Sequence, residues 1–424
     1  MSTASPGPIT AQAVSTRSGA SVDSTRSGAS VDSTRSGASV DELLQTVREL
    51  ASERYQGRRV GTPGGRAAAQ WLATRLSLLG ATARLDGFEV DGVKELLSTP
   101  VLTIGQRNLT HRRDFAEQLS SAEITTARRG RLVAADADTW RDGWIVVAAA
   151  DQQAVARALA EDAAGLLVPR GVDEAGWMPK MIAGPPMGQV AIVSVRGDLH
   201  AELADHAGET LTAFVPMRTI STTGINVYGV LSEPAPGCPS VLLTAHFDGV
   251  GDDPEVRFPA AADNASGVAV VLEAARLLSS AMPTGAGLAV ALLDGEEAGA
   301  RGSAHHAPQL TAGTLVINVD GAAQLGDAAA VEAGGPAEAL LAALDQAGRR
   351  AGVPLRAGAM ASDNRRYAAT GLPAIGIGMG MPGYQTPAET VDRVDPATLL
   401  AAVDLVVATV IQLIKNPAQL GEIA

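Results

Sequence analysis

The chain has 424 residues, which is enough for a large α/β domain and a second module, because single hydrophobic cores rarely grow beyond roughly 250 to 300 residues. It carries 33 Lys and Arg residues against 46 Asp and Glu residues, a formal net charge of −13. Such a charge repels phosphate backbones and anionic lipids, so we expect neither a nucleic-acid partner nor a membrane partner.

The sequence shows no obvious targeting segment. No stretch approaches the roughly 18 to 20 consecutive apolar residues that span a membrane. The N-terminus also lacks a basic region followed by an apolar one, so we expect a cytoplasmic protein. Cys238 is the single cysteine and is interpreted as a small buried or loop thiol, since no disulfide can form within the chain.

The nonapeptide Ser-Thr-Arg-Ser-Gly-Ala-Ser-Val-Asp occurs three times in succession over residues 15–41. A repeat this polar and rich in Gly and Ser buries too little apolar surface to offset its ordering entropy. Residues 1–40 are therefore predicted to be a disordered tail, and a docking or tethering tail is the alternative. Apolar residues at helical spacing predict a first helix from about Asp41 and a second over residues 64–79.

The remaining chain divides into two patterns. Residues 113–217 contain short apolar runs and one helix, which predicts a small β-rich module; the runs are 144–149, 165–168 and 190–195, and the helix covers 153–162. After Gly224 strands alternate with helices; the strands are 240–245, 288–293, 315–319 and 373–377, and the helices are 266–280, 337–351 and 396–414. This alternation predicts an α/β domain with a mostly parallel sheet covered by helices on both faces.

Acidic and imidazole side chains follow the predicted strands where each strand ends. The positions are His246 and Asp248, Asp263, Glu296 and Glu297, and Asp320. Open α/β sheets place their sites at the carboxyl ends of strands, so we expect these side chains to gather at one edge. An imidazole binds a metal through one nitrogen while a neighbour fixes the other, which makes Asp248 a candidate catalytic residue beside His246.

Each cluster also has a simpler interpretation when it is taken alone. His246 fits a surface histidine, Asp263 an N-terminal charge for the following helix, and Glu296 with Glu297 a solvated acidic turn. The chemical alternative has Asp263 bridging metals, while one glutamate coordinates a cation and the other takes a proton from its water. The succession of four such clusters at strand ends favours a shared metal site.

These motifs resemble the zinc aminopeptidase family of metallopeptidases, which also contains glutamate carboxypeptidase-like and glutaminyl cyclase-like members. The resemblance covers roughly residues 41–414, including Gly-Arg-Arg-Val-Gly-Thr-Pro-Gly at 57–64. It implies the zinc exopeptidase fold, with a mixed, mostly parallel sheet sandwiched by helices. It also implies a discontinuous peptidase domain, 41–112 and 218–418, and an inserted protease-associated domain at 113–217, which in this family covers or borders the active-site cleft.

The resemblance assigns roles by position. His246 and Asp320 are similar to the ligands of one zinc ion, and Asp263 to a carboxylate that bridges two ions. Glu297 is similar to a ligand of the second zinc, and Glu296 to the general base. The implied reaction is attack by a metal-held hydroxide on an amide carbonyl, after which Glu296 passes the proton to the leaving amine.

Gln385 breaks the family pattern at the second metal site. The family has a histidine in a Tyr-His-Thr segment, where this chain reads Tyr384, Gln385 and Thr386. An amide oxygen is a poorer ligand for zinc than an imidazole nitrogen, so the second site should be weaker, empty or occupied by a harder metal. Of the other histidines only His305 and His306 lie near a site loop, and a helix surface is the simpler interpretation for both.

Two further departures remove polar groups near the expected pocket. Ala262 stands where many relatives have an acidic residue, and Asn364 stands where relatives often have histidine. Tyr384 and Asn364 are candidates for binding the substrate, and together with Tyr367 they are candidates for stabilising the oxyanion. The changes indicate an altered substrate or a lost reaction.

Three hypotheses follow. The first is a metal-dependent hydrolase of peptide or amide bonds, an aminopeptidase-like exopeptidase with one firmly bound zinc and an uncertain second one, acting on a peptide or an aminoacyl small molecule. The second is a non-catalytic protein that keeps the peptidase fold for binding. The third, a mono-zinc acyl transferase or cyclase, ranks last because a cyclase-like site relies on the histidine that Gln385 replaces. The oligomeric state is not fixed by the sequence.

Overall fold

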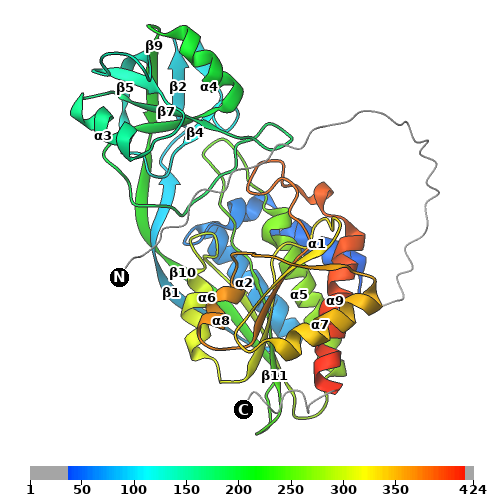
Figure 1. The fold of residues 1–424 in the computed structure, drawn as a ribbon. Helices are drawn as coiled ribbons and strands as arrows, with labels where there is room; N and C mark the ends of the chain where they lie inside the picture. Colours follow the sequence, from blue (N-terminus) through cyan, green and yellow to red (C-terminus); the bar gives the residue numbers. More distant parts are fainter. Residues whose placement is uncertain (1–36, 416–424) are drawn as a thin grey trace, which may run out of the picture. The chain divides into compact units, whose positions relative to one another are not determined.

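The computed structural model describes residues 37–415, so nearly all of the predicted repeat tail lies outside the described residues (Figure 1). Ser39 caps the first helix by accepting a hydrogen bond from the Glu42 backbone N–H, and Asp41 lies in the first turn. The second helix is capped by Thr62 and starts with Pro63. Proline suits the first position of a helix because it has no N–H group that would be left unpaired there.

The first sheet has eight strands in the order β1-β10-β12-β11-β13-β16-β14-β15. The strands are β1 (Thr82–Leu96), β10 (Met217–Ser232), β11 (Ser240–His246), β12 (Gly287–Leu293), β13 (Thr314–Val319), β14 (Ala329–Gly334), β15 (Leu355–Ala357) and β16 (Ala374–Gly378). The central strands β12, β11, β13 and β16 run parallel. β10 pairs antiparallel with both β1 and β12, and β14 pairs antiparallel with β16 but parallel with β15. The predicted mixed, mostly parallel α/β sheet is confirmed.

Helices cover both faces of this sheet, as Figure 1 shows. They are α1 (Val40–Leu50), η1 (Glu53–Arg58), α2 (Pro63–Leu78), η3 (Ala261–Ala265), α5 (Ser266–Ala281), α6 (Arg301–His306), η4 (Ala307–Gln309), α7 (Glu338–Ala351), α8 (Asn364–Ala369), η5 (Val391–Arg393) and α9 (Pro396–Lys415). Val241 and Leu243 of β11 pack in the core with α1, α2, α5, α7 and α9, while Leu242 packs with Tyr367 of α8 on the other face. Alternation along a strand explains this division.

A second eight-stranded sheet is built from the segment between β1 and β10, in the order β3-β2-β9-β5-β6-β7-β8-β4. Its elements are β2 (Val101–Ile104), β3 (Arg107–Leu109), β4 (Phe115–Glu117), β5 (Ile124–Ala134), β6 (Gly143–Val146), α3 (Gln152–Ala160), β7 (Gly165–Arg170), β8 (Ile192–Arg196), α4 (Gly197–Leu203), η2 (Ala204–His206) and β9 (Thr210–Val215). It has its own apolar core around Trp144. It also includes two strands that precede residue 113; its identity as a protease-associated domain stays a prediction.

Helix α9 departs from the expectation that no membrane-length apolar segment exists. By length and composition it passes for a membrane span, and it is the one described helix that does. It contains Asp404, and α5, α7 and α1 contact it, so that Leu399, Val403 and Val406 are buried. Packing against several helices is a sufficient reason for its apolar composition.

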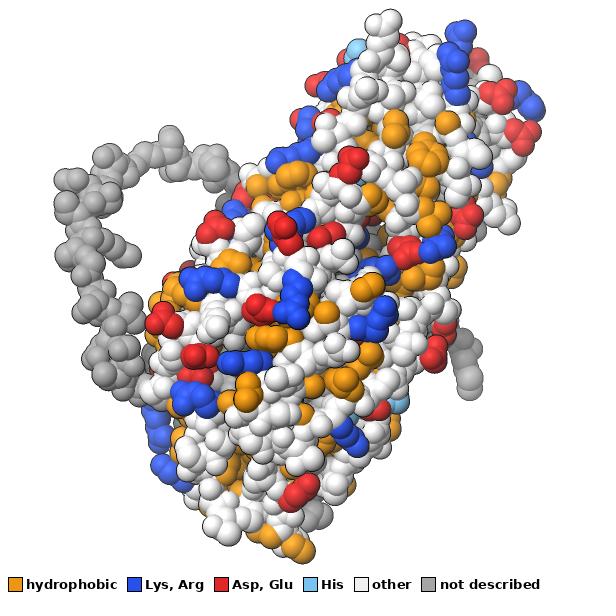
Figure 2. Space-filling view, turned by 180° about the vertical axis from the view of Figure 1, so that it is seen from behind, with side chains coloured by type: hydrophobic (Ala, Val, Ile, Leu, Met, Phe, Trp, Pro, Cys, Tyr) orange, Lys and Arg blue, Asp and Glu red, His pale blue; other side chains and the backbone are white. Residues whose placement is uncertain are grey.

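The surface charge is mixed. On the face in Figure 2, the Lys and Arg side chains are interspersed with Asp and Glu side chains over the described residues, without one broad basic area. Cys238 lies exposed in the loop between β10 and β11, which selects the loop-thiol interpretation.

Charged side chains buried near the second sheet join it to the loop after β11. Arg112 is fully buried, and its guanidinium donates to Glu117 Oε1 at 2.5 Å and to Asp253 Oδ2 at 2.7 Å. Lys180 Nζ lies 2.8 Å from Asp253 Oδ1 and donates to the carbonyl oxygen of Gly251. Burial by itself would raise the pKa of Asp253, but Arg112 and Lys180 bring it below its usual value.

Replacing Arg112 by Met should lower the free energy of unfolding by about 3–5 kcal/mol, because two carboxylates would stay buried without their partner. Chemical denaturation measures this. The matched control is Arg141→Met, which breaks the exposed pair with Asp162 and should cost less than about 1 kcal/mol. Equal small losses for both variants would show that the Arg112 guanidinium is not needed to offset the buried carboxylates.

A second stability prediction concerns His306, which is buried between Tyr228 and Tyr367 with Nδ1 2.9 Å from the Tyr367 hydroxyl. Burial lowers the pKa of His306 from 6.5 to about 4. The unfolded chain therefore takes up a proton at a higher pH than the folded protein does, and stability falls as the pH drops from about 6.5 toward 4.

Between pH 7.5 and pH 5 the wild type should lose roughly 2 kcal/mol of stability that His306→Gln does not lose. Urea unfolding at both pH values checks this difference. The exposed His206→Gln serves as the control and should keep the wild-type pH dependence. Identical pH dependence in wild type and His306→Gln would show that His306 is not the group responsible.

Candidate metal centre

Three predicted ligands meet at the carboxyl ends of two parallel neighbours, β11 and β13. His246 is the last residue of β11, Asp320 follows β13, and Asp263 lies in η3 just before α5. His246 Nε2 is 3.0 Å from Asp263 Oδ1 and 3.2 Å from Asp320 Oδ1, and all three side chains are buried. The donor atoms lie within 4.8 Å of one another, as donors around one ion must.

Asp248 fixes the orientation of the imidazole and of the glutamate turn. His246 Nδ1 lies 3.2 Å from the Asp248 carbonyl oxygen, which only accepts, so Nδ1 carries a proton and Nε2 is the nitrogen on the side of Asp263 and Asp320. The Asp248 carboxylate accepts the backbone N–H groups of Glu296 and Glu297 at 3.0 and 3.2 Å. Asp248 is fully buried and holds these two segments in place, and its catalytic role stays a prediction.

Two further residues support the site, and motif reading from the sequence did not identify them. Glu389 accepts hydrogen bonds from the backbone N–H of Asp263 and, at 2.9 Å, of Gln385, so one carboxylate fixes a ligand of each expected metal position. Buried Arg58 donates to the carbonyl oxygens of Phe247 and Ala260, which flank the His246 loop and η3. Arg58 could have been found from the sequence, because it lies in the glycine-rich segment 57–64. Glu389 lies four residues after Gln385 and belongs to no recognisable motif.

Glu296 and Glu297 differ in their partners. Glu297 Oε2 accepts a hydrogen bond from Gln385 Nε2 at 2.5 Å. The Glu296 side chain forms no hydrogen bond or ion pair with residues 37–415, and it is only partly buried. Adjacent glutamates therefore do have different surroundings, as the irregular turn predicts.

The centre concentrates buried negative charge. Burial raises the pKa of Glu296 and of Glu297 well above the ordinary value, and neighbouring carboxylates such as Asp263 act in the same direction. Burial also raises the pKa of Asp363 to about 7, with one oxygen accepting from Ser303 and the other unpartnered. Buried carboxylates are stable when paired with cations or coordinated to metals.

The residues at the first position fit a zinc ion. Asp263 Oδ1 is buried and accepts no hydrogen bond, and His246 Nε2 lies 3.0 Å away. Two carboxylates and one imidazole are the oxygen and nitrogen donors that zinc prefers, and three protein ligands leave a position open for water or substrate. A divalent cation would also offset the charge of these carboxylates.

The candidate substrate-binding residues differ in their exposure and in their hydrogen-bond partners. Tyr384 is 48% exposed, and burial of its hydroxyl together with nearby Asp263 and Glu297 raises its pKa, which places it at the rim of the centre. Asn364 is buried and donates to Glu332, so the predicted substrate contact is not supported by its position. Tyr367 is fully buried against His306, which removes it as an oxyanion donor.

Neither of the neighbouring histidines joins the centre. His305 stacks on Phe88 and lies 3.2 Å from Asp86. His306 belongs to the core between α6 and α8, so the expected surface location is wrong for this residue. Ala262, where relatives have an acidic residue, is fully buried in the core that contains α5.

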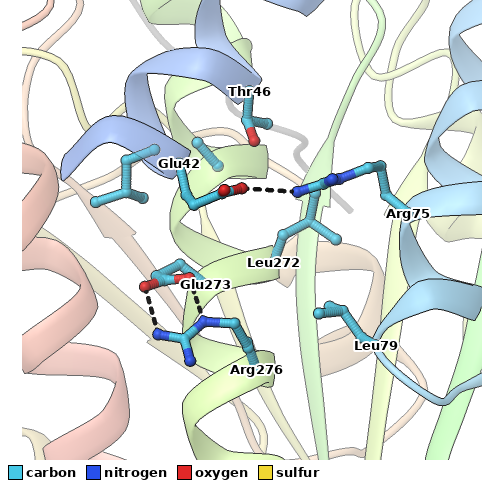
Figure 3. A pocket seen from close by; sticks show the side chains of 9 residues that line it. Glu42, Thr46, Arg75, Leu79, Leu272, Glu273 and Arg276 are labelled. Atoms are coloured by element: carbon cyan, nitrogen blue, oxygen red, sulfur yellow. Dashed lines mark hydrogen bonds and ion pairs between the residues drawn. The ribbon is translucent and has the colours of Figure 1, made fainter. Parts of the chain in front are cut away.

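A small pocket between α1, α2 and α5 is separate from this centre (Figure 3). Its charged residues are paired, Arg75 with Glu42 and Arg276 with Glu273. Glu273 is seven residues into α5, or roughly 10 Å along the helix from the end that carries Asp263. The pocket contains none of the predicted site residues.

Comparison with known proteins agrees with this arrangement. Residues 226–410 match the model of peptidase family M28. Comparison with curated proteins found no match. An aminopeptidase from Aneurinibacillus sp. strain AM-1 has 22% identity and a TM-score of 0.62, and the match covers 88% of this chain and 93% of that one. A zinc aminopeptidase from Bacillus subtilis has 20% identity and a TM-score of 0.68, covering 88% and 94%.

A peptidase M28 precursor from Shewanella amazonensis SB2B has 18% identity and a TM-score of 0.61, with 89% and 97% of the two chains covered. Sequence identities of 18 to 22% to these solved structures show a shared fold and nothing more specific. The segment that matches family M28 contains every predicted metal ligand. The chain therefore has the fold of the zinc aminopeptidases, and its metal-centre segment matches peptidase family M28.

Proposed function

We propose that this protein is a metal-dependent hydrolase of peptide or amide bonds, an aminopeptidase-like member of family M28. One observation carries the proposal: His246, Asp263 and Asp320 form a buried cluster of metal donors, and the free carboxylate of Glu296 follows the neighbouring strand β12. The match of residues 226–410 and the shared fold support it.

His246, Asp263 and Asp320 would hold one zinc ion. When bound there, zinc supplies a Lewis acid and lowers the pKa of a bound water from 15.7 to about 7. Asp248 keeps the imidazole tautomer that presents the Nε2 lone pair. Glu389 and Asn264 hold the Asp263 loop, since Asn264 donates to the carbonyl oxygen of Val319 beside Asp320.

Glu296 is the group that moves protons in this proposal. Its carboxylate has no competing partner among the described residues, and burial raises its pKa above the ordinary value, which makes it a stronger proton acceptor. It would take a proton from the attacking water and return it to the leaving amine. Tyr384, at the rim, is the remaining described candidate to donate to the carbonyl oxygen of the substrate.

The substrate proposed is a peptide or a small aminoacyl amide. The surplus of carboxylates attracts a cationic group, and the ammonium at the start of a peptide is such a group. The competing candidate is a peptide-binding protein without catalysis, favoured by the Gln385 to Glu297 hydrogen bond at the second metal position. The acyl-transferase reading has no specific observation in its favour.

The change Glu296→Gln should reduce turnover of aminoacyl amides by about 10²- to 10⁴-fold, because it removes the proton acceptor and keeps the shape of the side chain. Zinc content by mass spectrometry should stay at the wild-type value. The control is Glu338→Gln on the exposed side of α7, which should leave turnover unchanged. Wild-type activity in Glu296→Gln would remove its assignment as the base.

Removing metal tests the ligand cluster separately from the reaction. Zinc at 100 times its dissociation constant should stabilise the wild-type chain by about 2.7 kcal/mol, and chelation should reverse this. His246→Ala should bind no zinc and show no zinc-dependent rise in melting temperature. The same rise in His246→Ala would place the ion elsewhere, and no zinc effect in the wild type would favour the non-catalytic candidate.

A further inference from the structure

We propose that the Gln385 side chain takes the place of the second metal ion, so that the centre holds a single ion at His246, Asp263 and Asp320. This inference rests on the proposed function. It concerns the position next to Glu297, where the chain departs from the family sequence. The neutral NH₂ group of Gln385 gives Glu297 a hydrogen bond at the place where a metal ion would otherwise bind this carboxyl group.

The distances distinguish the two positions. Two ligand atoms on one tetrahedral zinc, each bonded at 2.0–2.2 Å, lie roughly 3.4 Å apart. At the first position the separations of 3.0 and 3.2 Å between His246 Nε2 and the Asp263 and Asp320 oxygens are near this value. At the second position Gln385 Nε2 is 2.5 Å from Glu297 Oε2, which is much closer than two ligand atoms of one zinc ion lie, and the two atoms are joined by a hydrogen bond.

The chemistry of the amide leads to the same conclusion. Gln385 Nε2 donates to Glu297 Oε2, so the amide group that faces Glu297 is the NH₂ group, which has no lone pair for a metal. Turning the amide over would bring its oxygen against the carboxylate oxygens and replace an attraction by a repulsion. The amide also gives the partly buried Glu297 carboxyl group a hydrogen-bond partner without a second ion.

The backbone keeps Gln385 in this position. Its N–H donates to Glu389 Oε2 at 2.9 Å, and its carbonyl oxygen accepts from the Lys180 N–H at 2.8 Å. Gln385 has φ of 53°, an uncommon conformation for a residue other than glycine, and these two bonds hold it there. Thr386 donates to Asp173 and so ties the following residue to the same segment as Lys180. With 6% of its surface exposed, the side chain has little freedom to turn outward.

Metal stoichiometry tests the inference directly. Wild type, Gln385→His and the matched control Gln385→Ala are stripped with chelator and titrated with zinc by calorimetry, and bound metal is counted by mass spectrometry. The expected counts are one ion for wild type, two for Gln385→His, in which an imidazole replaces the donor, and one for Gln385→Ala, which removes the amide without adding a ligand. The same titration is repeated with Mn²⁺, which prefers oxygen ligands.

A second readout needs no variant. Wild type loaded with Co²⁺ should give the electron paramagnetic resonance spectrum of an isolated ion, whereas two adjacent ions would couple magnetically. Two zinc or two manganese ions in wild type, or a coupled spectrum, would overturn the inference while leaving the proposed hydrolase intact. If Gln385→His bound only one ion, Gln385 would not be the residue that excludes the second ion. No ion in wild type would instead contradict the proposed function, on which this inference rests.

Discussion

Negative charge buried at one end of the first sheet is the constraint on which the rest of the centre depends. Buried Asp248, Asp263, Asp320 and Glu389 come together there with partly buried Glu297 and few basic side chains. Each carboxylate that leaves water loses hydration that hydrogen bonds or cations must replace. The Arg58 guanidinium supplies positive charge nearby, although burial lowers its own pKa to about 10.

The loops around the centre are arranged to meet this demand. Backbone N–H groups of Glu296 and Glu297 point at Asp248, and those of Asp263 and Gln385 point at Glu389. Each of these carboxylates thereby links two loops that come from different strands. The same backbone hydrogen bonds stabilise each buried carboxylate and fix the geometry of the site. They do so without adding positive charge.

The segment from the second sheet takes part in this network. Lys180 reaches Gly251 through its side chain and Gln385 through its backbone, so the loops after β11 and before α9 are both held by residues outside the first sheet. This connection gives the inserted segment a physical role at the centre even where it contributes no ligand. The same connection holds the backbone of Gln385, so that its side-chain amide stays directed at Glu297.

Much of this protein follows from the sequence by itself. The strand and helix alternation after Gly224 predicted the α/β sheet, because apolar periodicity reflects burial that any such sheet requires. The clusters at strand ends predicted that His246, Asp263 and Asp320 would meet, since parallel strands bring their carboxyl ends to one edge. The departure at Gln385 was visible through the resemblance to the zinc aminopeptidase family, which has a histidine in this segment.

Only the tertiary structure decided which partners these side chains take. Glu389, Arg58 and Lys180 act through hydrogen bonds between segments far apart in the chain, and no local pattern encodes such pairings. His306 and Asn364 became core residues because α6 and α8 pack together on one face, which overrides their polar character. The sequence therefore determined the set of chemical groups at the centre, whereas long-range packing determined that Glu297 faces an amide and Glu296 stays free.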